Sequence, residues 1–426
     1  MRNNLLGVGL LILVGSCLSA NYAVLIQGSS GWYNYGQGSD NCHAYNTLIN
    51  GGYDPNNIIL FSYNDLAFNS QNPFPGKLFN SPDSPDYYPK CVIDYTGLEV
   101  TPQNYLNVLK GDSTAMKGIG SGRVLKATKN DSVFFFYSDH GGMGLVAFPG
   151  SYLYAVDLQA VLTQIWQKGG YGKAVYYMEA CNSGSMFMNF PTNQMLYAVT
   201  SATPYQSAWM TYCPPDDDVI NGVHMGTCIG DMFSTSYLFN ADATNTDKQT
   251  LQQEFVTVSA LVTESQCCQY GDLSFVSDNV SGFLGNSNPS GINKITGKPV
   301  SQIKTPKGKT HISKREYKLR MLINRHAALM TAETQAELNT EILSRKFFDD
   351  IFFKIKAMNH EVPRATNTNF DCYKDMINTF ETACGRFSDY GMQYMEVFYN
   401  LCNTQKDTFP VKAFFIQTCS RKAKME

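Results

Sequence analysis

The sequence has few charged residues and no recognisable metal site. Charged residues make up 16% of the 426 residues, hydrophobic residues make up 43%, and the net charge is −3. This balance excludes wholesale disorder and argues against a nucleic-acid-binding protein. The six histidines are scattered, and no HxxxH or CxxC pair occurs. We therefore expect neither a metal nor another cofactor.

Long apolar runs are also absent beyond the first twenty residues. Arg2 precedes an apolar run over residues 5–18, and Ser19-Ala20 supplies a small-residue cleavage site. This pattern is typical of a secretory signal peptide, assigned here to residues 1–20. No later stretch approaches eighteen apolar residues, so we expect no membrane span in the mature chain.

Export makes disulfides and glycans possible. Twelve cysteines are present, and Cys17 would leave with the signal peptide. The remaining eleven are odd in number, so at least one thiol stays free unless an intermolecular bridge forms. Sequons at Asn130 and Asn279 are candidate glycan acceptors.

Charge is distributed unevenly along the chain. Residues 21–293 carry a net charge of −12, residues 294–326 carry +9 with Glu316 as their one acid, and residues 327–426 carry −1. An acidic domain followed by a basic segment suggests an intramolecular electrostatic pairing. A solvated basic linker explains the composition equally well.

The first two-thirds of the sequence alternates apolar runs with stretches of helical spacing. Short runs rich in Val, Ile, Phe and Tyr predict strands at 23–27, 58–63, 132–138, 174–179 and 196–202. Apolar residues at helical spacing predict helices at 40–50, 102–110 and 156–168. Strands that alternate with helices indicate an α/β domain with a mainly parallel sheet covered on both faces.

The last third has a different pattern. Residues 285–310 are rich in Gly, Ser, Asn, Pro and Lys without periodicity, which is typical of a linker. From about Ile312 onward the apolar residues recur at three- and four-residue steps, with no strand-like alternation. We therefore expect a small all-helical domain at the carboxyl end.

Polar or glycine-rich segments follow two of the predicted strands. The strand 132–138 runs into Asp139-His140-Gly141, and the strand 174–179 runs into Ala180-Cys181. Ligands bind beyond the carboxyl ends of parallel strands, and a neighbouring imidazole can deprotonate a thiol. If the strands are neighbours, Cys181 and His140 form a nucleophile and acid/base pair. A buried structural cysteine and a satisfied core histidine are the alternative.

Several strings occur in an order that is more specific than this pattern. They include Gly31-Trp32-Tyr33-Asn34-Tyr35, Asp40-Asn41-Cys42-His43-Ala44-Tyr45, Ser138-Asp139-His140-Gly141 and Glu179-Ala180-Cys181-Asn182-Ser183-Gly184. The chain resembles the legumain family of asparaginyl endopeptidases over nearly its whole mature length. The resemblance implies a caspase-like three-layer α/β fold and a helical prodomain. It divides the chain into a catalytic domain (21–285), a basic activation segment (286–324) and a disulfide-bonded prodomain (325–426).

The resemblance also implies roles for individual residues. Cys181 and His140 match the catalytic dyad, Gly141 matches an oxyanion-hole residue, and Asn34 matches the residue that orients the histidine. Further matches are an aspartate able to form an aspartimide (Asp139), two pocket acids (Glu179 and Asp231) and the strand that flanks the substrate (Ser207 and Trp209).

One departure from the family concerns the specificity pocket. Gly36-Gln37 stands where the family has Arg-His, and Ala208 replaces a usual serine. The missing arginine would balance the two pocket acids, and like charges in a desolvated pocket raise one pKa or recruit a cation. Two outcomes follow: Gln37 partly replaces the lost donor and keeps Asn selectivity, or the pocket accepts a basic side chain.

The resemblance suggests the disulfides Cys372–Cys402, Cys384–Cys419 and Cys213–Cys228. We expect Cys42, on a predicted helix, to be buried and free. Three further cysteines, Cys91, Cys267 and Cys268, stay without an assignment.

The implied activity is that of an acid-activated peptidase zymogen in a lysosomal, vacuolar or other acidic vesicle. Its partners would be peptide and protein substrates and cystatin-like inhibitors. Asn324 is the candidate self-cleavage site, with nearby Lys or Arg residues as alternatives. Three other functions use the same fold: a ligase, for which a bulky Met210 would matter, a transamidase, and a non-catalytic binding protein.

Overall fold

A computed structural model describes residues 19–286, 288, 308–358, 363–404 and 407–422. Residues 1–18 of the expected signal peptide and most of the predicted linker, including four of its lysines, lie outside these ranges.

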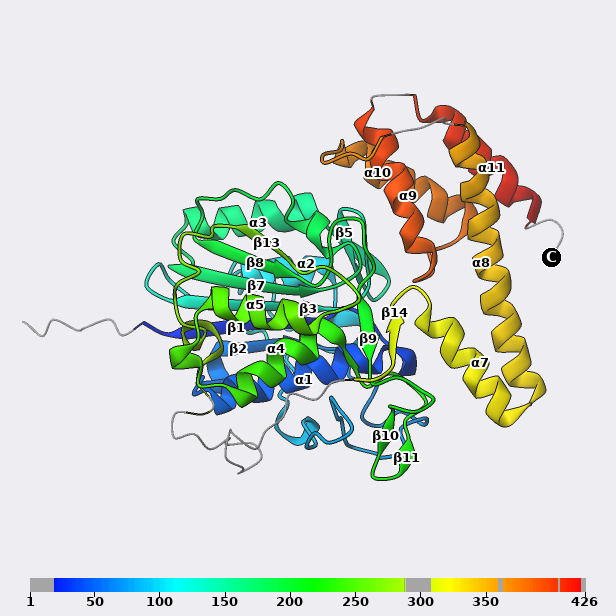
Figure 1. Ribbon diagram of the computed structural model, residues 1–426. Helices are drawn as coiled ribbons and strands as arrows, with labels where there is room; N and C mark the ends of the chain where they lie inside the picture. Colours follow the sequence, from blue (N-terminus) through cyan, green and yellow to red (C-terminus); the bar gives the residue numbers. More distant parts are fainter. Residues whose placement is uncertain (1–18, 287, 289–307, 359–362, 405–406, 423–426) are drawn as a thin grey trace, which may run out of the picture.

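A six-stranded sheet in the order β13-β8-β7-β3-β1-β2 forms the centre of the first domain, which was predicted to be the catalytic domain and keeps that name below (Figure 1). Five strands are parallel, and β13 pairs with β8 in the antiparallel sense. The strands are β1 (Asn21–Gln27), β2 (Ile58–Phe61), β3 (Ser132–Ser138), β7 (Lys173–Glu179), β8 (Leu196–Thr200) and β13 (Cys268–Gly271). All five predicted strands are therefore present, within two residues at each end.

Helices cover both faces of this sheet. The central strand β3 requires this, because it carries apolar residues on both sides. Val133 and Phe135 pack against helices α2 (Pro102–Leu109) and α3 (Ala155–Gln167). Phe134 and Phe136 point to the other face, in the core formed with α1, α4 and α5 (Tyr35–Asn50, Met232–Ala243, Leu251–Leu261). The predicted α/β class with a mainly parallel, two-sided sheet is confirmed.

Short elements complete the catalytic domain. They are β4 (Gly141–Gly142), β5 (Leu145–Phe148), β6 (Ser151–Tyr154), β9 (Trp209–Thr211), β10 (Val219–Ile220), β11 (Val223–His224), β12 (Gly230–Asp231) and α6 (Ser281–Leu284).

The carboxyl-terminal part is helical, as predicted, and lies beside the catalytic domain (Figure 1). It contains α7 (Tyr317–Leu329), α8 (Ala332–Met358), α9 (Phe370–Cys384), α10 (Met395–Asn403) and α11 (Phe409–Lys422). Its aromatic core extends onto Met143 and Leu145 of the catalytic domain. An ion pair of 2.8 Å between Lys374 and Asp157 joins the two parts.

Two expectations about this region and its cysteines need correction. The chain at 311–313 is a strand, β14 (His311–Ser313), because its backbone pairs with β9. Three residues are too few to show alternation in the sequence. Cys42 is bonded to Cys91, with 5.3 Å between the Cα atoms, so it is not free.

The other predicted disulfides, Cys213–Cys228, Cys372–Cys402 and Cys384–Cys419, are present. Among the described residues, the free cysteines are Cys181, Cys267 and Cys268.

Candidate active site

The register of the sheet brings the two predicted reacting residues to one edge. β3 and β7 are neighbours, and Ser138 lies opposite Glu179 at their carboxyl ends. Asp139-His140 and Ala180-Cys181 therefore leave the sheet at the same level. The backbone N–H of Asp139 donates to the Glu179 carbonyl at 2.9 Å, which ties the two exits together.

The hydrogen bonds of Asn34 fix the tautomer of His140. The amide nitrogen of Asn34 donates to the Ser30 carbonyl at 2.7 Å, so its Oδ1 atom faces the imidazole. His140 Nε2 lies 2.8 Å from that oxygen. An oxygen can only accept, so Nε2 carries the hydrogen and the buried Nδ1 of neutral His140 has a free lone pair. Nδ1 has no hydrogen-bond partner among the described residues.

Cys181 is a free, fully buried thiol in a close-packed turn. The backbone N–H of Ala208 lies 3.3 Å from its Sγ atom and donates to it. Gly141 lies against this turn, since a Cβ atom there would be 2.4 Å from the Cys181 carbonyl oxygen. Glycine is therefore required for the two backbones to approach, an arrangement suited to an oxyanion site.

Three buried acids form a pocket next to this turn. Glu179 and Asp231 were predicted, and Asp40 joins them from α1. Ser138 Oγ links Asp40 and Asp231, at 3.2 and 3.0 Å from their carboxylate oxygens. One oxygen of Glu179 accepts from the backbone N–H groups of Phe233 and Ser234, at the start of α4. The α4 terminus thus stabilises the charge of Glu179.

Burial and mutual repulsion shift the titration of these acids. Burial raises the pKa of Glu179 to about 7, although nearby Lys314 lowers it. Burial and the charge of Asp231 raise the pKa of Asp40 well above its ordinary value. Burial also raises the pKa of Asp139, which lies outside this cluster, and lowers the pKa of His140.

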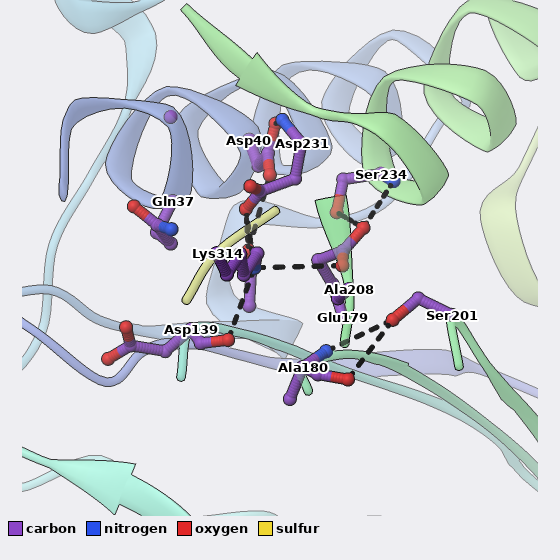
Figure 2. A network of polar contacts seen from close by, with 12 residues as sticks. Gln37, Asp40, Asp139, Glu179, Ala180, Ser201, Ala208, Asp231, Ser234 and Lys314 are labelled. Carbon is purple, nitrogen blue, oxygen red and sulfur yellow. Dashed lines mark hydrogen bonds and ion pairs between the residues drawn. The ribbon is translucent and has the colours of Figure 1, made fainter. Parts of the chain in front are cut away.

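The pocket contains the side chain of Lys314, which the basic segment supplies (Figure 2). Its Nζ atom lies 2.9 Å from Asp231 Oδ2 and 3.6 Å from Glu179 Oε1, and it donates to the Asp139 carbonyl at 3.1 Å. The side chains of the lysine and its two partner acids are fully buried. The cation expected from the family's arginine thus comes from elsewhere in the chain.

Lys314 reaches the pocket because the basic segment (294–326) adds the strand β14 to the catalytic domain. β14 runs antiparallel to β9, with Ile312 opposite Met210 and Ser313 opposite Trp209. The Lys314 N–H then donates to the Ala208 carbonyl at 3.0 Å. Trp209 thus lies on the strand that was predicted to flank a substrate. Ser207, half-buried, precedes the Ala208 contact.

The residues after Lys314 cover the reacting pair. Arg315 donates to the Gly141 carbonyl and to Asn182 Oδ1, the latter at 3.0 Å. Tyr317 donates to Asn34 Oδ1 at 2.6 Å and stacks on the His140 ring, with 5.9 Å between the ring centroids. Asp389, from the helical domain, lies 3.7 Å from His140.

The remaining predicted residues occupy varied positions. Gln37 is buried, and neither atom of its amide has a hydrogen-bond partner among the described residues. Met210 packs among Tyr317, Met321 and a disulfide, which favours a packing role. Asn324 lies within α7, whereas Asn130 and Asn279 are exposed.

Sequence reasoning missed three residues of the site: Asp40, Tyr317 and Asp389. It counted Lys314 and Arg315 only within a basic segment. A signal existed for Asp40, since it is the one acid in an otherwise uncharged helix. No local pattern marks the others, because their contacts depend on how the linker folds back.

No helix in the described ranges is long and apolar enough to cross a membrane. Within those same ranges, no group of three or more His, Cys, Asp or Glu side chains is arranged to hold a metal ion.

Comparison with known proteins identifies the family of this chain. Residues 21–286 match the Peptidase C13 family, and residues 337–419 match the legumain prodomain. The chain is 34% identical to the delta-isozyme of vacuolar-processing enzyme from Arabidopsis thaliana, over 95% of this chain and 91% of that protein. It is 33% identical to vacuolar-processing enzyme from Vicia sativa (94% and 85%) and 32% identical to legumain from Canavalia ensiformis (91% and 86%).

A solved structure, caspase-1 from Spodoptera frugiperda, aligns with a TM-score of 0.36 at 9% identity, over 62% of this chain and 92% of that one. At that score the comparison carries no weight, and the fold rests on the strand order described above. The family match spans well over half of the chain and the related sequences span nearly all of it. This chain belongs to the Peptidase C13 family, the legumain-type cysteine endopeptidases, and carries the family's prodomain.

Proposed function

We propose that this chain is the zymogen of an endopeptidase in which Cys181 is the nucleophile and His140 the acid/base. The observation that carries the proposal is the fixed tautomer of His140. Its Nε2–H is held by Asn34, so the lone pair of Nδ1 can accept the thiol proton.

The reaction follows from these groups. His140 Nδ1 takes the proton of Cys181, and the thiolate attacks the carbonyl carbon of the scissile bond. The N–H groups of Gly141 and Cys181 then receive the oxyanion. The imidazolium protonates the leaving amine, which departs and leaves a thioester. Water, deprotonated by His140, hydrolyses the thioester and restores the thiol.

The covering segment supports a latent precursor that opens in acid. Burial raises the pKa of Glu179 to about 7 and Lys314 lowers it, so by linkage the ionised carboxylate holds Lys314 more tightly than the protonated one does. This ion pair is therefore strongest at pH values above the pKa of Glu179. It weakens as pH falls through about 7 and Glu179 takes a proton.

His140 adds to this trend. Burial is the largest cause that lowers the pKa of His140; Asp389 raises it, and Lys314 and Arg315 lower it further, so the covered form favours the neutral ring. Acid therefore adds a positive charge to His140 next to two covering cations, and the cover is weakened further.

An acidic vesicle suits this behaviour, and the names of the plant relatives refer to the vacuole. We include peptide and protein substrates and cystatin-like inhibitors in the proposal. Asn324 stays a candidate cleavage site, but α7 would have to unwind around it. A cut at Lys314, directly after the extended strand β14, needs no such unwinding, whereas Lys318, Arg320 and Arg325 lie within α7 as Asn324 does. The masses of the products formed at acid pH distinguish these sites.

Labelling with a thiol-reactive peptidyl electrophile tests the proposal. The acid-treated protein should label at Cys181, and Cys181→Ala should abolish the label. His140→Ala should lower the labelling rate and the peptidase activity at least a hundredfold. Cys268→Ala is the matched control, since Cys268 is also a free cysteine, and its labelling and activity should equal those of the unmodified sequence. Full activity of Cys181→Ala would refute the proposal.

A further inference from the structure

We infer that the specificity pocket selects a cationic side chain, lysine above all, at the residue before the scissile bond. This inference rests on the proposed peptidase function and names its substrate class. The Lys314 side chain between Asp231 and Glu179 is its main support (Figure 2).

Lys314 enters the pocket on a backbone that is bound as an extended strand. Ser313 and Ile312 pair with Trp209 and Met210, and the Lys314 N–H donates to the Ala208 carbonyl. The same Ala208 residue donates its N–H to the Cys181 sulfur. A peptide bound along β9 in this register therefore presents one side chain to the acids, next to the thiol.

The charge of the pocket also favours a cation. Asp40, Glu179 and Asp231 are buried together, and among the described residues Lys314 is the one cation that pairs with them. Once the linker leaves, up to three carboxylates face the empty pocket. A cationic substrate side chain restores the ion pairs, whereas a neutral side chain leaves the acids without a charged partner.

Gly36 carries no side chain, so the catalytic domain supplies no cation to the pocket from this position. A Cβ atom here would lie 3.2 Å from the Gly230 carbonyl carbon and 3.0 Å from the Met210 methyl carbon. The backbone of Gly230 and the Met210 side chain thus pack closely against Gly36. Gln37, which Figure 2 shows across Lys314 from Glu179, supplies a neutral amide and no charge.

The carbonyl of Asp139 is a further acceptor for a cationic side chain in the pocket. It accepts from the Lys314 ammonium at 3.1 Å, and Figure 2 shows Asp139 and Asp231 on opposite sides of Lys314. The pocket therefore presents acceptors from three residues to one ammonium group: Asp231, Glu179 and Asp139. An Asn side chain is shorter, and its carbonyl oxygen would have to rely on a neutral donor such as the Gln37 amide, with no cation to balance the acids.

A matched peptide series tests the inference on the acid-treated full chain, assayed at pH 7. Four fluorogenic peptides differ only in the residue before the reporter: Lys, Arg, Asn or norleucine. We expect kcat/KM for the Lys peptide to exceed that for the Asn and norleucine peptides at least tenfold. Asn-directed cleavage that equals or exceeds Lys-directed cleavage would overturn the inference and leave the peptidase proposal intact.

A second probe separates the peptidase proposal from the proposed cationic preference. It is a peptidyl electrophile that carries uncharged norleucine at the residue that enters the pocket, and labelling of Cys181 is measured. Loss of both labelling and cleavage contradicts the peptidase function itself. Labelling together with cleavage after residues other than Lys and Arg contradicts only the cationic preference.

Variants of the pocket acids provide the second test. Asp231→Asn and Glu179→Gln should each lower the ratio of Lys to norleucine cleavage at least tenfold. The ratio does not depend on how much enzyme folds, so a partly unfolded variant stays informative. The control Asp112→Asn changes an exposed acid of the same domain and should leave the ratio unchanged. Equal ratios in all three variants would overturn the inference.

Discussion

Lys314 and Arg325 belong to the same basic segment of the sequence, yet they have opposite environments. Lys314 is fully buried against two acids of the catalytic domain. Arg325 pairs with Glu337 of the helical domain, and both side chains are about one-third exposed. Lys318 likewise pairs within the helical part, with Glu341 at 3.4 Å. Among the described residues, the interaction that the net charges suggested is thus concentrated at Lys314.

The difference shows that position, and not the number of charges, decides what a cation contributes. Water screens an exposed pair, while it does not reach the charges of a buried pair. Four predictions test this comparison, beginning with the largest expected effect.

Removing the buried cation should open the precursor. In Lys314→Ala, the acids lose their partner, and breaking a buried pair costs about 3–5 kcal/mol. We expect Cys181 in the neutral-pH precursor to label roughly a hundredfold faster than in the unmodified sequence. Lys318→Ala is the matched control and should label at the unmodified rate. Equal rates for both variants would contradict the assigned importance of Lys314.

Lowering the pH should also accelerate Cys181 labelling in the precursor, as Lys314→Ala does, but gradually with pH. The labelling rate of the precursor should rise as pH falls through about 7, because protonation of Glu179 removes one partner of Lys314. The rise is limited to about tenfold per pH unit for each proton taken up. In Glu179→Gln the rise near pH 7 should be reduced. An unchanged pH profile in that variant would assign the acid response to other groups.

The contact of Tyr317 with Asn34 and His140 should stabilise the closed precursor less than Lys314 does. Tyr317→Phe removes the hydrogen bond to Asn34 Oδ1 and keeps the ring that stacks on His140. One hydrogen bond stabilises by about 0.5–1.5 kcal/mol, so precursor labelling should accelerate roughly threefold to tenfold. Tyr88→Phe is the matched control, since it removes a tyrosine hydrogen bond to Asn64 that is not part of the covering contacts. A hundredfold acceleration would mean that Tyr317, and not Lys314, holds the cover closed.

The exposed pair should have the smallest effect. Arg325→Ala removes the ion pair with Glu337, and exposed pairs contribute about 0–1 kcal/mol. The labelling rate of Cys181 in the neutral-pH precursor should be unchanged. The midpoint of thermal unfolding should change by only a few degrees at most. If Arg325→Ala accelerated Cys181 labelling as much as Lys314→Ala does, the distinction between the two cations would be wrong.

Much of the fold follows from local pattern. The strand 132–138 was found with its observed limits because its residues are apolar on both faces, as a central parallel strand requires. The helix that begins at Tyr35 was predicted only from Asp40, since Gly36-Gln37-Gly38 has no apolar spacing. The pairing of Cys42 with Cys91 lies beyond any local signal, because it depends on how a loop returns to α1.

The sequence by itself determined the family, the two-domain order, and the candidate residues at the ends of β3 and β7. Each of these depends on short-range strings or on the two periodicities of helix and strand. Only the tertiary structure decided which cation neutralises the pocket. Gly36 indicated that a cation was missing, but Lys314 is 278 positions further along the chain. Its burial results from the added strand β14, a contact between distant segments that no local pattern encodes.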